Sequence, residues 1–441
     1  MQTVADRDVA ATYAVDQSLG AVAPADFQVV RARDRDDVVE VLREAAATHT
    51  PVVPQGGRTG LAGGAVATEG SIVLNVEGLD RIEELDELER TAVVGPGVVT
   101  ATLKEAAAAV GLAYPPDPAS AAWCTVGGNV ATNAGGLCCV KYGVTADYVR
   151  GLEVVLAGGS VMRTGRRTAK GVAGFDLTGL FVGSEGLLGV VTSVRVRLVP
   201  APDPPLTALG VFDSLAQAAA GVVALREDHP GPSLIEVLDG PTIELLQEVG
   251  DFGFPAGTAG AVLVQSDRPG GAHEDVQRYA SLLSSAGAVD VAVADDAQEA
   301  DALMAGRRAL HAANERKGPH FTEDVCVPVR RLADLIEAGH RVGAQHGVEV
   351  TLSGHGGDGN LHPCFFFALD DPDSRERAEA AFDGLVRTAL EMGGTITGEH
   401  GVGSLKAKWL PLELGEAEMA RQRAVKAVFD PLGIMNPGKV L

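Results

Sequence analysis

Glycine-rich loops between short apolar segments are the feature that most constrains the fold of this chain. Three stretches concentrate glycine within the first 200 residues: PVVPQGGRTGLAGGAV (51–66), PPDPASAAWCTVGGNVATNAGG (115–136) and FVGSEGLLGVVT (181–192). Because glycine has no Cβ, backbone N–H groups in such loops can approach an anion such as pyrophosphate. A tight structural loop is the alternative for any single stretch, but three together suit an extended ligand, and a dinucleotide fits.

The two commonest nucleotide-binding signatures are missing from these loops. No Gly-x-Gly-x-x-Gly opens a helix there, and no Gly-x-x-x-x-Gly-Lys-Ser/Thr is present. The loops are therefore typical neither of a Rossmann fingerprint nor of a P-loop.

The length of 441 residues predicts two or three domains, because single hydrophobic cores stop growing at about 250–300 residues. Apolar periodicity predicts a helix over 37–48, and GLEVVLAGGSVMRTG (151–165) has the pattern of a hairpin. The proline-rich PAPDPP (200–205) predicts a domain boundary. Beyond it, an α+β domain is expected from alternating helical stretches (214–227, 275–287, 330–347) and strands (259–266, 348–353).

Charge and composition exclude some classes of protein. With 36 Lys and Arg against 59 Asp and Glu, the net charge is −23, which disfavours nucleic acids and anionic membranes as partners. No run of eighteen apolar residues and no signal-peptide pattern occurs, so we expect a cytoplasmic protein without an integral membrane segment. The five cysteines form no Cys-x-x-Cys pair and are expected to be reduced thiols, although adjacent Cys138 and Cys139 could be a redox pair.

The segment SGHGGDGNLHP (353–363) places two histidines at a predicted turn between two strands. Imidazoles held at the facing ends of a hairpin can share a divalent metal if a third ligand converges on them. His355 and His362 are therefore candidate ligands, although such a pair is also common in purely structural roles. Asp358 in the turn could orient a ligand or only cap the turn.

Six segments in order give the chain a specific resemblance. They are PQGGRTGLAGG, GGNVATNAGG, GFDLTGLFVGSEGLLGVV, SGHGGDGNLHP, TGEHGVG and DPLGIMNPGKVL. Together they resemble the FAD-dependent D-2-hydroxy-acid dehydrogenases, the group acting on D-lactate, glycolate and D-2-hydroxyglutarate. The resemblance implies an α+β protein: a two-subdomain FAD-binding domain of the vanillyl-alcohol-oxidase type (1–200), a substrate or cap domain with an antiparallel sheet and the metal site (206–415), and a C-terminal segment that returns to the FAD domain (416–441).

The same resemblance implies the residues that hold FAD. They are Pro54, Gly56, Gly57, Thr59, Gly60 and Gly63 at the pyrophosphate, Asn133, Gly135 and Gly136 beside the ribityl chain and flavin, Gly186 and Val190 near the nucleotide end, and Asn436 in the tail. Some relatives attach FAD covalently through a histidine of the first loop. That loop has no histidine here, so noncovalent FAD is expected, and Arg58 either pairs with phosphate or is solvated.

For catalysis, the resemblance implies that Glu399 completes a metal site with His355 and His362, and that His400 is the base. A bound cation, zinc or manganese, lowers the pKa of the substrate hydroxyl, and a histidine can take the proton. Arg307 is the expected partner of the substrate carboxylate, because guanidinium offers a two-pronged donor. An ordinary helix-surface arginine is the alternative.

The resemblance leaves the substrate and the acceptor open. His311 and Thr322 stand where the 2-hydroxyglutarate enzymes have a threonine and a lysine, which favours D-lactate or glycolate, with D-2-hydroxyglutarate as the alternative. The electron acceptor could be an electron-transfer flavoprotein, a quinone or a cytochrome, and a homodimer is possible. Competing hypotheses are a metal-dependent hydrolase without flavin, a flavin-dependent synthase without redox turnover, and a partner subunit that has lost turnover.

Overall fold

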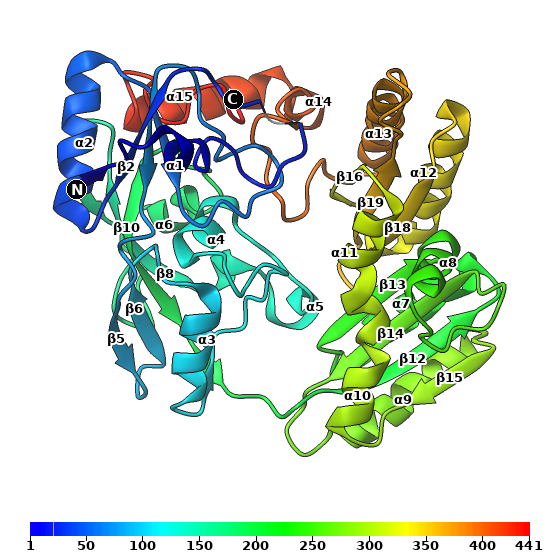
Figure 1. The fold of residues 1–441 in the computed structure, drawn as a ribbon. Coiled ribbons are helices and arrows are strands. Elements are labelled where there is room, and N and C mark those ends of the chain that lie inside the picture. Colours follow the sequence, from blue (N-terminus) through cyan, green and yellow to red (C-terminus); the bar gives the residue numbers. More distant parts are fainter. Residues whose placement is uncertain (21) are drawn as a thin grey trace. The chain divides into compact units, whose positions relative to one another are not determined.

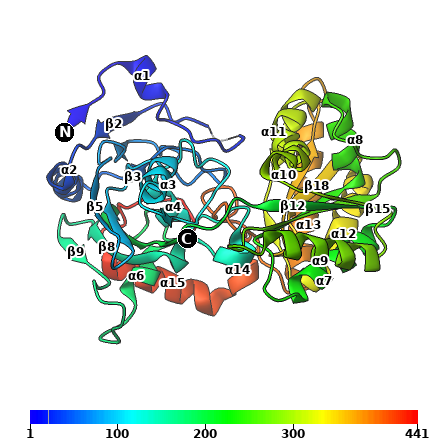
Figure 2. The same cartoon turned by 90° about the horizontal axis from the view of Figure 1, so that it is seen from below.

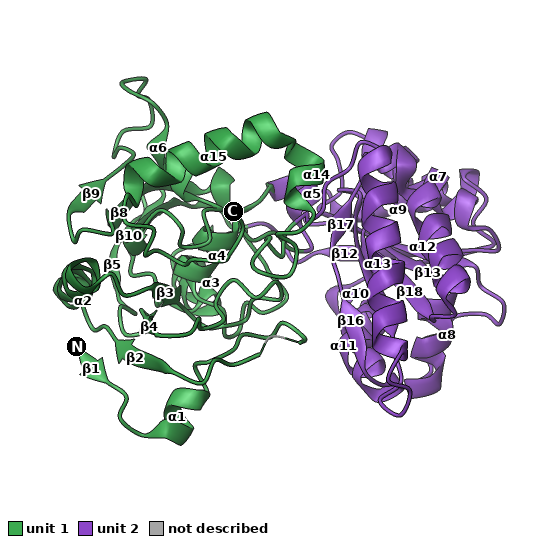
Figure 3. Ribbon diagram, turned by 90° about the horizontal axis from the view of Figure 1, so that it is seen from above, with its two compact units in different colours: residues 1–136, 143–201, 399–441 green, residues 137–142, 202–398 purple. Residues whose placement is uncertain are grey.

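The structure, a computed structural model, describes residues 1–20 and 22–441 and separates the chain into two compact units (Figure 3). Unit 1 comprises residues 1–136, 143–201 and 399–441, and unit 2 comprises residues 137–142 and 202–398. Of the described residues, no helix has both the length and the apolar composition that crossing a bilayer requires.

The first sheet of unit 1 is covered by one amphipathic helix, α2 (Arg35–Thr48). The helix begins after Asp34, whose side chain accepts a hydrogen bond from the Asp37 N–H at 2.9 Å. Its residues Val38, Val41, Leu42 and Ala45 are buried, which confirms the helix predicted over 37–48. The four strands, in sheet order, are β1 (Gln2–Thr3), β2 (Phe27–Arg31), β4 (Ser71–Asn75) and β3 (Val52–Gln55), of which β2, β4 and β3 run parallel.

The second sheet of unit 1 is antiparallel and has five strands (Figure 1). The predicted hairpin at 151–165 is confirmed as β8 (Val149–Val155) and β9 (Val161–Arg163). β10 (Val190–Arg197) alternates buried and partly buried residues, as one covered face requires. The other strands of unit 1 are β5 (Ile82–Asp86) and β6 (Thr91–Val94) in this sheet, and the separate pair β7 (Leu112–Ala113) and β11 (Val199–Pro200).

The remaining helices of unit 1 are short, apart from the last. They are α1 (Arg7–Ala11), α3 (Thr100–Ala108), α4 (Val126–Thr132), η1 (Thr145–Asp147), α6 (Leu177–Phe181), α14 (Leu410–Leu414) and α15 (Glu416–Phe429). After α15 the chain returns to β3, where the Val52 N–H donates to Ile434 O at 2.8 Å and the Asn436 N–H donates to Val52 O at 2.8 Å. The C-terminal segment is therefore fixed beside the strand that leads into the first glycine-rich loop.

Unit 2 is built on one antiparallel sheet of eight strands. In sheet order the strands are β15 (Asp290–Val293), β12 (Leu206–Phe212), β14 (Gly260–Ser266), β13 (Leu234–Asp239), β18 (Val350–His355), β19 (Asn360–Phe366) and β16 (His320–Thr322), and β17 (Val325–Cys326) also pairs with β19. β18 and β19 form the hairpin that the sequence predicted around SGHGGDGNLHP.

Helices cover both faces of this sheet (Figure 2). One face carries α8 (Gly240–Val249), α10 (Ala297–Leu303) and α11 (Ala305–Lys317). The other carries α7 (Leu215–Glu227), α9 (Ala272–Ser285), α12 (Leu332–His346) and α13 (Ser374–Glu391), and the short η2 (Val329–Arg331) precedes α12. The core on the α8 and α11 side is apolar and includes Leu209, Leu238, Leu246, Leu310 and Phe366.

A short segment after the second glycine-rich loop, residues 137–142 with α5 (Cys139–Tyr142), belongs to unit 2. Leu137 and Cys138 pack against the apolar core beneath α8 and α11. The Tyr142 hydroxyl donates to Asp267 Oδ2 at 2.6 Å, and the Lys141 ammonium binds Asp267 Oδ1. The chain therefore enters unit 2 once before residue 143 and again after residue 201, and no pattern in the sequence indicates the first entry.

Candidate active site

The three glycine-rich stretches converge around the end of β3, all within unit 1. A Cβ on Gly57 would lie 2.6 Å from Trp123 O, and a Cβ on Gly56 would lie 2.3 Å from Thr125 Oγ1. A Cβ on Gly186, which has a φ of +76°, would lie 3.0 Å from Pro54 Cγ. Because side chains would collide at these positions, glycine is required for the loops to approach one another.

The second loop contributes residues in conformations that other side chains rarely adopt. Asn133 ends α4 at a φ of 53°, and its Oδ1 accepts a hydrogen bond from the Ala146 N–H at 2.8 Å. Gly136 has a φ of +156°, and a Cβ there would lie 2.3 Å from Asp117 O. Gly63 of the first loop has a φ of +78°, and its Cβ would lie 2.4 Å from Ser404 Oγ.

The C-terminal segment contacts the first and third glycine-rich stretches through Asn436. Its Nδ2 donates to Gly64 O at 2.9 Å and to Glu185 O at 2.7 Å. Its Oδ1 is buried and has no hydrogen-bond partner among the described residues, and the same holds for Gln55 Oε1. Two acceptors without a donor, beside closely packed glycine loops, fit a bound cofactor that offers hydrogen-bond donors. The described loops therefore fit FAD, and Val190 lies buried at the start of β10 beside them.

Arg58 of the first loop makes two contacts within unit 1. Its Nη1 lies 3.2 Å from Glu77 Oε2, and its guanidinium lies 4.3 Å from the centre of the Tyr13 ring. The positive charge of Arg58 is therefore matched by Glu77 within unit 1. The backbone of Arg58 has a φ of +57°.

The two predicted metal-binding histidines lie together on the β18–β19 hairpin of unit 2. Their Nε2 atoms are 3.3 Å apart. Zn–N bonds of about 2.0–2.1 Å at a tetrahedral angle place two ligand nitrogens about 3.3–3.4 Å apart, so the separation of these atoms fits one shared ion. Asp358, in the turn, donates its N–H to His355 O at 3.1 Å and closes the turn, whose Gly359 has a φ of +76°.

A buried carboxylate that the sequence analysis missed, Glu236 on β13, joins this pair to Arg307 on α11. Glu236 Oε1 lies 2.5 Å from His355 Nδ1, and Oε2 accepts a hydrogen bond from Arg307 Nε. Burial raises the pKa of Glu236, but His355 and Arg307 outweigh burial and lower the pKa to about 2. In the sequence, Glu236 is visible only as a glutamate within the apolar segment LIEVLD. That pattern alone does not tell whether the glutamate is a buried site residue or faces solvent.

Asp324 is a second buried carboxylate of unit 2 that the sequence analysis did not single out. One of its oxygens lies within 4.8 Å of a ring nitrogen of His362. Its Oδ2 accepts hydrogen bonds from Thr397 Oγ1 at 2.5 Å and from the Gly398 N–H at 2.8 Å. Asp324 thus fixes the backbone that leads directly into Glu399.

The segment GGTITGEHGVG (393–403) predicts a strand that ends with Glu399 and His400, and this prediction is wrong. Only Thr395 makes a bridge, with Cys326, and residues 398–400 form a bend. Gly393, at a φ of +80°, and Gly394 interrupt the extended backbone. Asp324 then accepts hydrogen bonds from Thr397 and Gly398, which are no longer available to a neighbouring strand.

Glu399 and His400 open the third segment of unit 1. His400 Nε2 lies 4.0 Å from Glu399 Oε1. Buried Glu185, also missed from the sequence, accepts hydrogen bonds from the Val402 N–H at 2.7 Å and the Gly403 N–H at 2.8 Å. Burial raises the pKa of Glu185 despite those two donors. The backbone that follows His400 is therefore fixed by a carboxylate of the third glycine-rich stretch.

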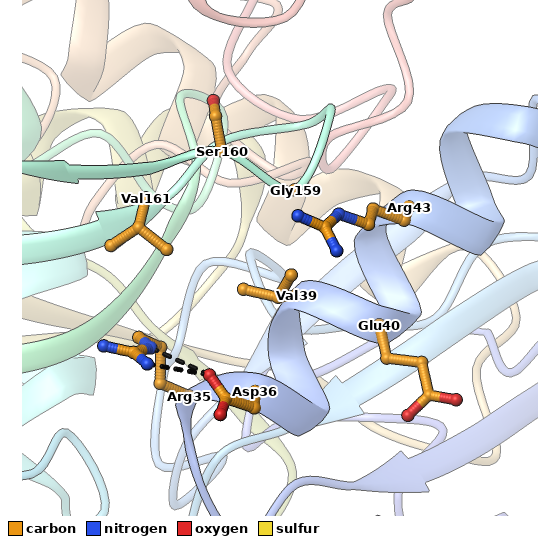
Figure 4. A pocket seen from close by; sticks show the side chains of 8 residues that line it. All are labelled: Arg35, Asp36, Val39, Glu40, Arg43, Gly159, Ser160 and Val161. Atoms are coloured by element: carbon orange, nitrogen blue, oxygen red, sulfur yellow. Dashed lines mark hydrogen bonds and ion pairs between the residues drawn. The ribbon is translucent and has the colours of Figure 1, made fainter.

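A surface pocket of about 560 Å³ in unit 1 contains none of the predicted site residues (Figure 4). It lies between α2 and the β8–β9 turn and is lined by Arg35, Asp36, Val39, Glu40, Arg43, Gly159, Ser160 and Val161. The Arg35 guanidinium is hydrogen-bonded to Asp36 there, so its charge is already matched.

Comparison with known proteins shows the family to which the chain belongs. Residues 202–440 match the model for the C-terminal domain of FAD linked oxidases, and residues 28–165 match an FAD binding domain. The glycolate oxidase subunit GlcD of Bacillus subtilis is 41% identical over 414 residues, covering 93% of this chain and 88% of that protein. A D-lactate dehydrogenase of Archaeoglobus fulgidus is 34% identical, covering 97% and 95%.

The solved structure of 4-ethylphenol oxidase from Gulosibacter chungangensis has a TM-score of 0.79 at 20% identity, covering 99% of this chain and 94% of that one. This likeness concerns the fold alone, and it confirms the flavoprotein fold with mixed helices and antiparallel sheets that the sequence predicted. The family resemblance is confirmed as well. The chain belongs to the FAD-linked oxidases, the family that includes the GlcD glycolate oxidase subunits and the D-lactate dehydrogenases, and it is an FAD-dependent oxidoreductase.

Proposed function

We propose that this protein oxidises a small D-2-hydroxy acid, D-lactate or glycolate, to the 2-oxo acid. The observation that carries the proposal is the continuous set of contacts in unit 2 from Arg307 through Glu236 to His355 and His362. It holds a guanidinium suited to a carboxylate near two imidazoles suited to a metal ion, and a 2-hydroxy acid presents a carboxylate beside a hydroxyl. The names of the relatives, glycolate oxidase subunit and D-lactate dehydrogenase, agree with this chemistry.

Each residue has a role in this proposal. Arg307 binds the substrate carboxylate through its terminal nitrogens, because its Nε is already bonded to Glu236. His355 and His362 hold a divalent metal, zinc or manganese, with Glu399 as third ligand, since Glu399 follows directly on the backbone that Asp324 fixes. The metal, when bound, lowers the pKa of the substrate hydroxyl. His400 takes the hydroxyl proton.

FAD, when bound, accepts the hydride that leaves the α carbon of the substrate. The proposed cofactor residues of unit 1 are those of the three converging loops together with Asn436, and the binding is noncovalent because the first loop has no histidine. Unit 1 then forms the FAD module and unit 2 carries the substrate side. Residues 399–415, which the sequence predicted in the substrate domain of 206–415, belong to unit 1 with the tail 416–441. An electron-transfer flavoprotein, a quinone or a cytochrome would reoxidise the flavin.

A panel of D- and L-2-hydroxy acids, added anaerobically to the purified protein, tests the proposal through the flavin absorbance near its visible maximum. Bleaching by D-lactate or glycolate is expected. Bleaching by D-2-hydroxyglutarate alone would assign the larger diacid instead, and a yellow protein that no hydroxy acid bleaches would refute the oxidation. A colourless protein that retains zinc would favour the hydrolase.

A further inference from the structure

We infer that Glu236 is a positioning residue with two roles. It selects the tautomer of His355 that can bind a metal, and it orients Arg307 toward the substrate. The inference rests on the proposed function of His355 and Arg307.

The fold places Glu236 opposite His355 on adjacent strands. In the β13–β18 ladder, Val237 pairs with Gly354 and Leu238 pairs with Ser353, so the register brings Glu236 next to His355. The Glu236 side chain is fully buried, and that of His355 is 6% exposed. Each carboxylate oxygen has its own charged or polar donor, His355 Nδ1 on Oε1 and Arg307 Nε on Oε2. A buried carboxylate with both oxygens used in this way is rigid.

The contact determines which nitrogen of His355 is available to a metal. A neutral imidazole carries one N–H, and a carboxylate can only accept, so the proton lies on Nδ1. The lone pair is then on Nε2, the atom that lies 3.3 Å from His362 Nε2. A carboxylate behind a ligating histidine also raises the basicity of the histidine, which strengthens metal binding.

The same carboxylate limits the orientations of Arg307. Bonding at Nε fixes the plane of the guanidinium and leaves the two terminal nitrogens, for which the structure records no hydrogen bond among the described residues. Those nitrogens form the fork that a substrate carboxylate would bind. Removing the charge of Glu236 should therefore weaken metal binding and substrate binding together.

The test is Glu236→Gln, because glutamine has the shape of glutamate but only one accepting oxygen. If the amide nitrogen faces His355, it donates to Nδ1 and moves the imidazole proton to Nε2, where it blocks the metal. If it faces Arg307, two donors meet, and the amide oxygen accepts from His355 Nδ1 without the negative charge that raises the basicity of that histidine. We expect the zinc dissociation constant, measured by competition with a chelator, to rise about 10- to 100-fold. We also expect KM for the hydroxy acid to rise.

The matched control is Asp239→Asn. Asp239 is another buried carboxylate of β13 that binds a histidine: its Oδ2 lies 2.7 Å from His340 Nε2 and accepts from the Leu352 N–H at 2.9 Å. It should change stability and leave the zinc dissociation constant unchanged. Equal zinc affinity in Glu236→Gln and wild type would overturn the inference, as would an equal loss in the control.

Two further measurements keep the outcomes separate. If Glu236→Gln does not fold, Glu236→Asp keeps the charge but shortens the side chain by one methylene, so it should weaken zinc binding as well, and unchanged affinity there would overturn the inference. A wild-type protein that binds no divalent metal, or that loses none on His362→Ala, would instead refute the proposed metal site on which the inference rests.

Discussion

Replacing Gly57 by alanine should separate the first and second glycine-rich loops. An alanine Cβ would lie 2.6 Å from Trp123 O, about 0.8 Å closer than an ordinary contact of about 3.4 Å. The obstructing atom is a backbone oxygen, so no side chain can rotate away. Inserting a methyl group into such a contact costs about 1–3 kcal/mol. If the loops move apart, this energy corresponds to about 5- to 150-fold weaker FAD binding.

Two measurements show whether the added strain weakens FAD binding or lowers the free energy of unfolding. Fluorescence titration of the apoprotein gives the FAD dissociation constant, and denaturant unfolding gives the free energy of unfolding. Loops that move apart weaken FAD binding, whereas loops that stay in place lose stability of similar size. Gly158→Ala, in the β8–β9 turn, is the control, because its Cβ would meet nothing within 4 Å and its φ is not positive. A Gly57→Ala protein that matches this control in both measurements would refute the reasoning.

Three other changes have defined outcomes. His400→Ala should reduce the rate of anaerobic flavin bleaching by about 10²–10⁴-fold if His400 is the base, with FAD content unchanged, and undiminished bleaching would exclude that role. Arg307→Lys should raise KM for the hydroxy acid by about tenfold or more, because an ammonium cannot offer the two-pronged donor, and an unchanged KM would place the substrate carboxylate elsewhere. Asp275 accepts hydrogen bonds from Ser266, Arg268 and Arg278, which outweigh burial and hold its pKa below the usual range. Its contribution to stability is present above the unfolded pKa of about 3.9 and is lost as the pH falls through the lower folded value, so Asp275→Asn should flatten the acid side of the curve of unfolding free energy against pH.

The features predicted from the sequence were those with a local cause. Apolar periodicity is sufficient for α2 and for the β8–β9 hairpin, and turn residues are sufficient for the hairpin that carries His355 and His362. The glycine clusters predicted loops whose backbone can approach a ligand closely. The structure shows in addition that several of these glycines lie where a Cβ would collide with a neighbouring loop.

The features missed from the sequence depend on distant partners. Glu236 is recognisable only when its opposite neighbour on β18, more than a hundred residues later, is known to be His355. Glu185 and Asp324 bind backbone N–H groups, which leave no mark on the residue types they hold. The residues before Glu399 are suitable for a strand, and a strand was therefore predicted there. In the structure the carboxylate of Asp324 accepts their hydrogen bonds in place of a neighbouring strand.

The early entry of residues 137–142 into unit 2 means that the protein cannot be dissected at its obvious proline-rich junction. In a fragment ending at residue 201, Leu137 and Cys138 would lack the apolar core against which they pack. Lys141 and Tyr142 would lack their hydrogen-bond partner Asp267. During synthesis those six residues would emerge long before β13 and Asp267 exist. The stretch just after the second glycine-rich loop would therefore be among the last parts of the amino-terminal half to reach its final environment.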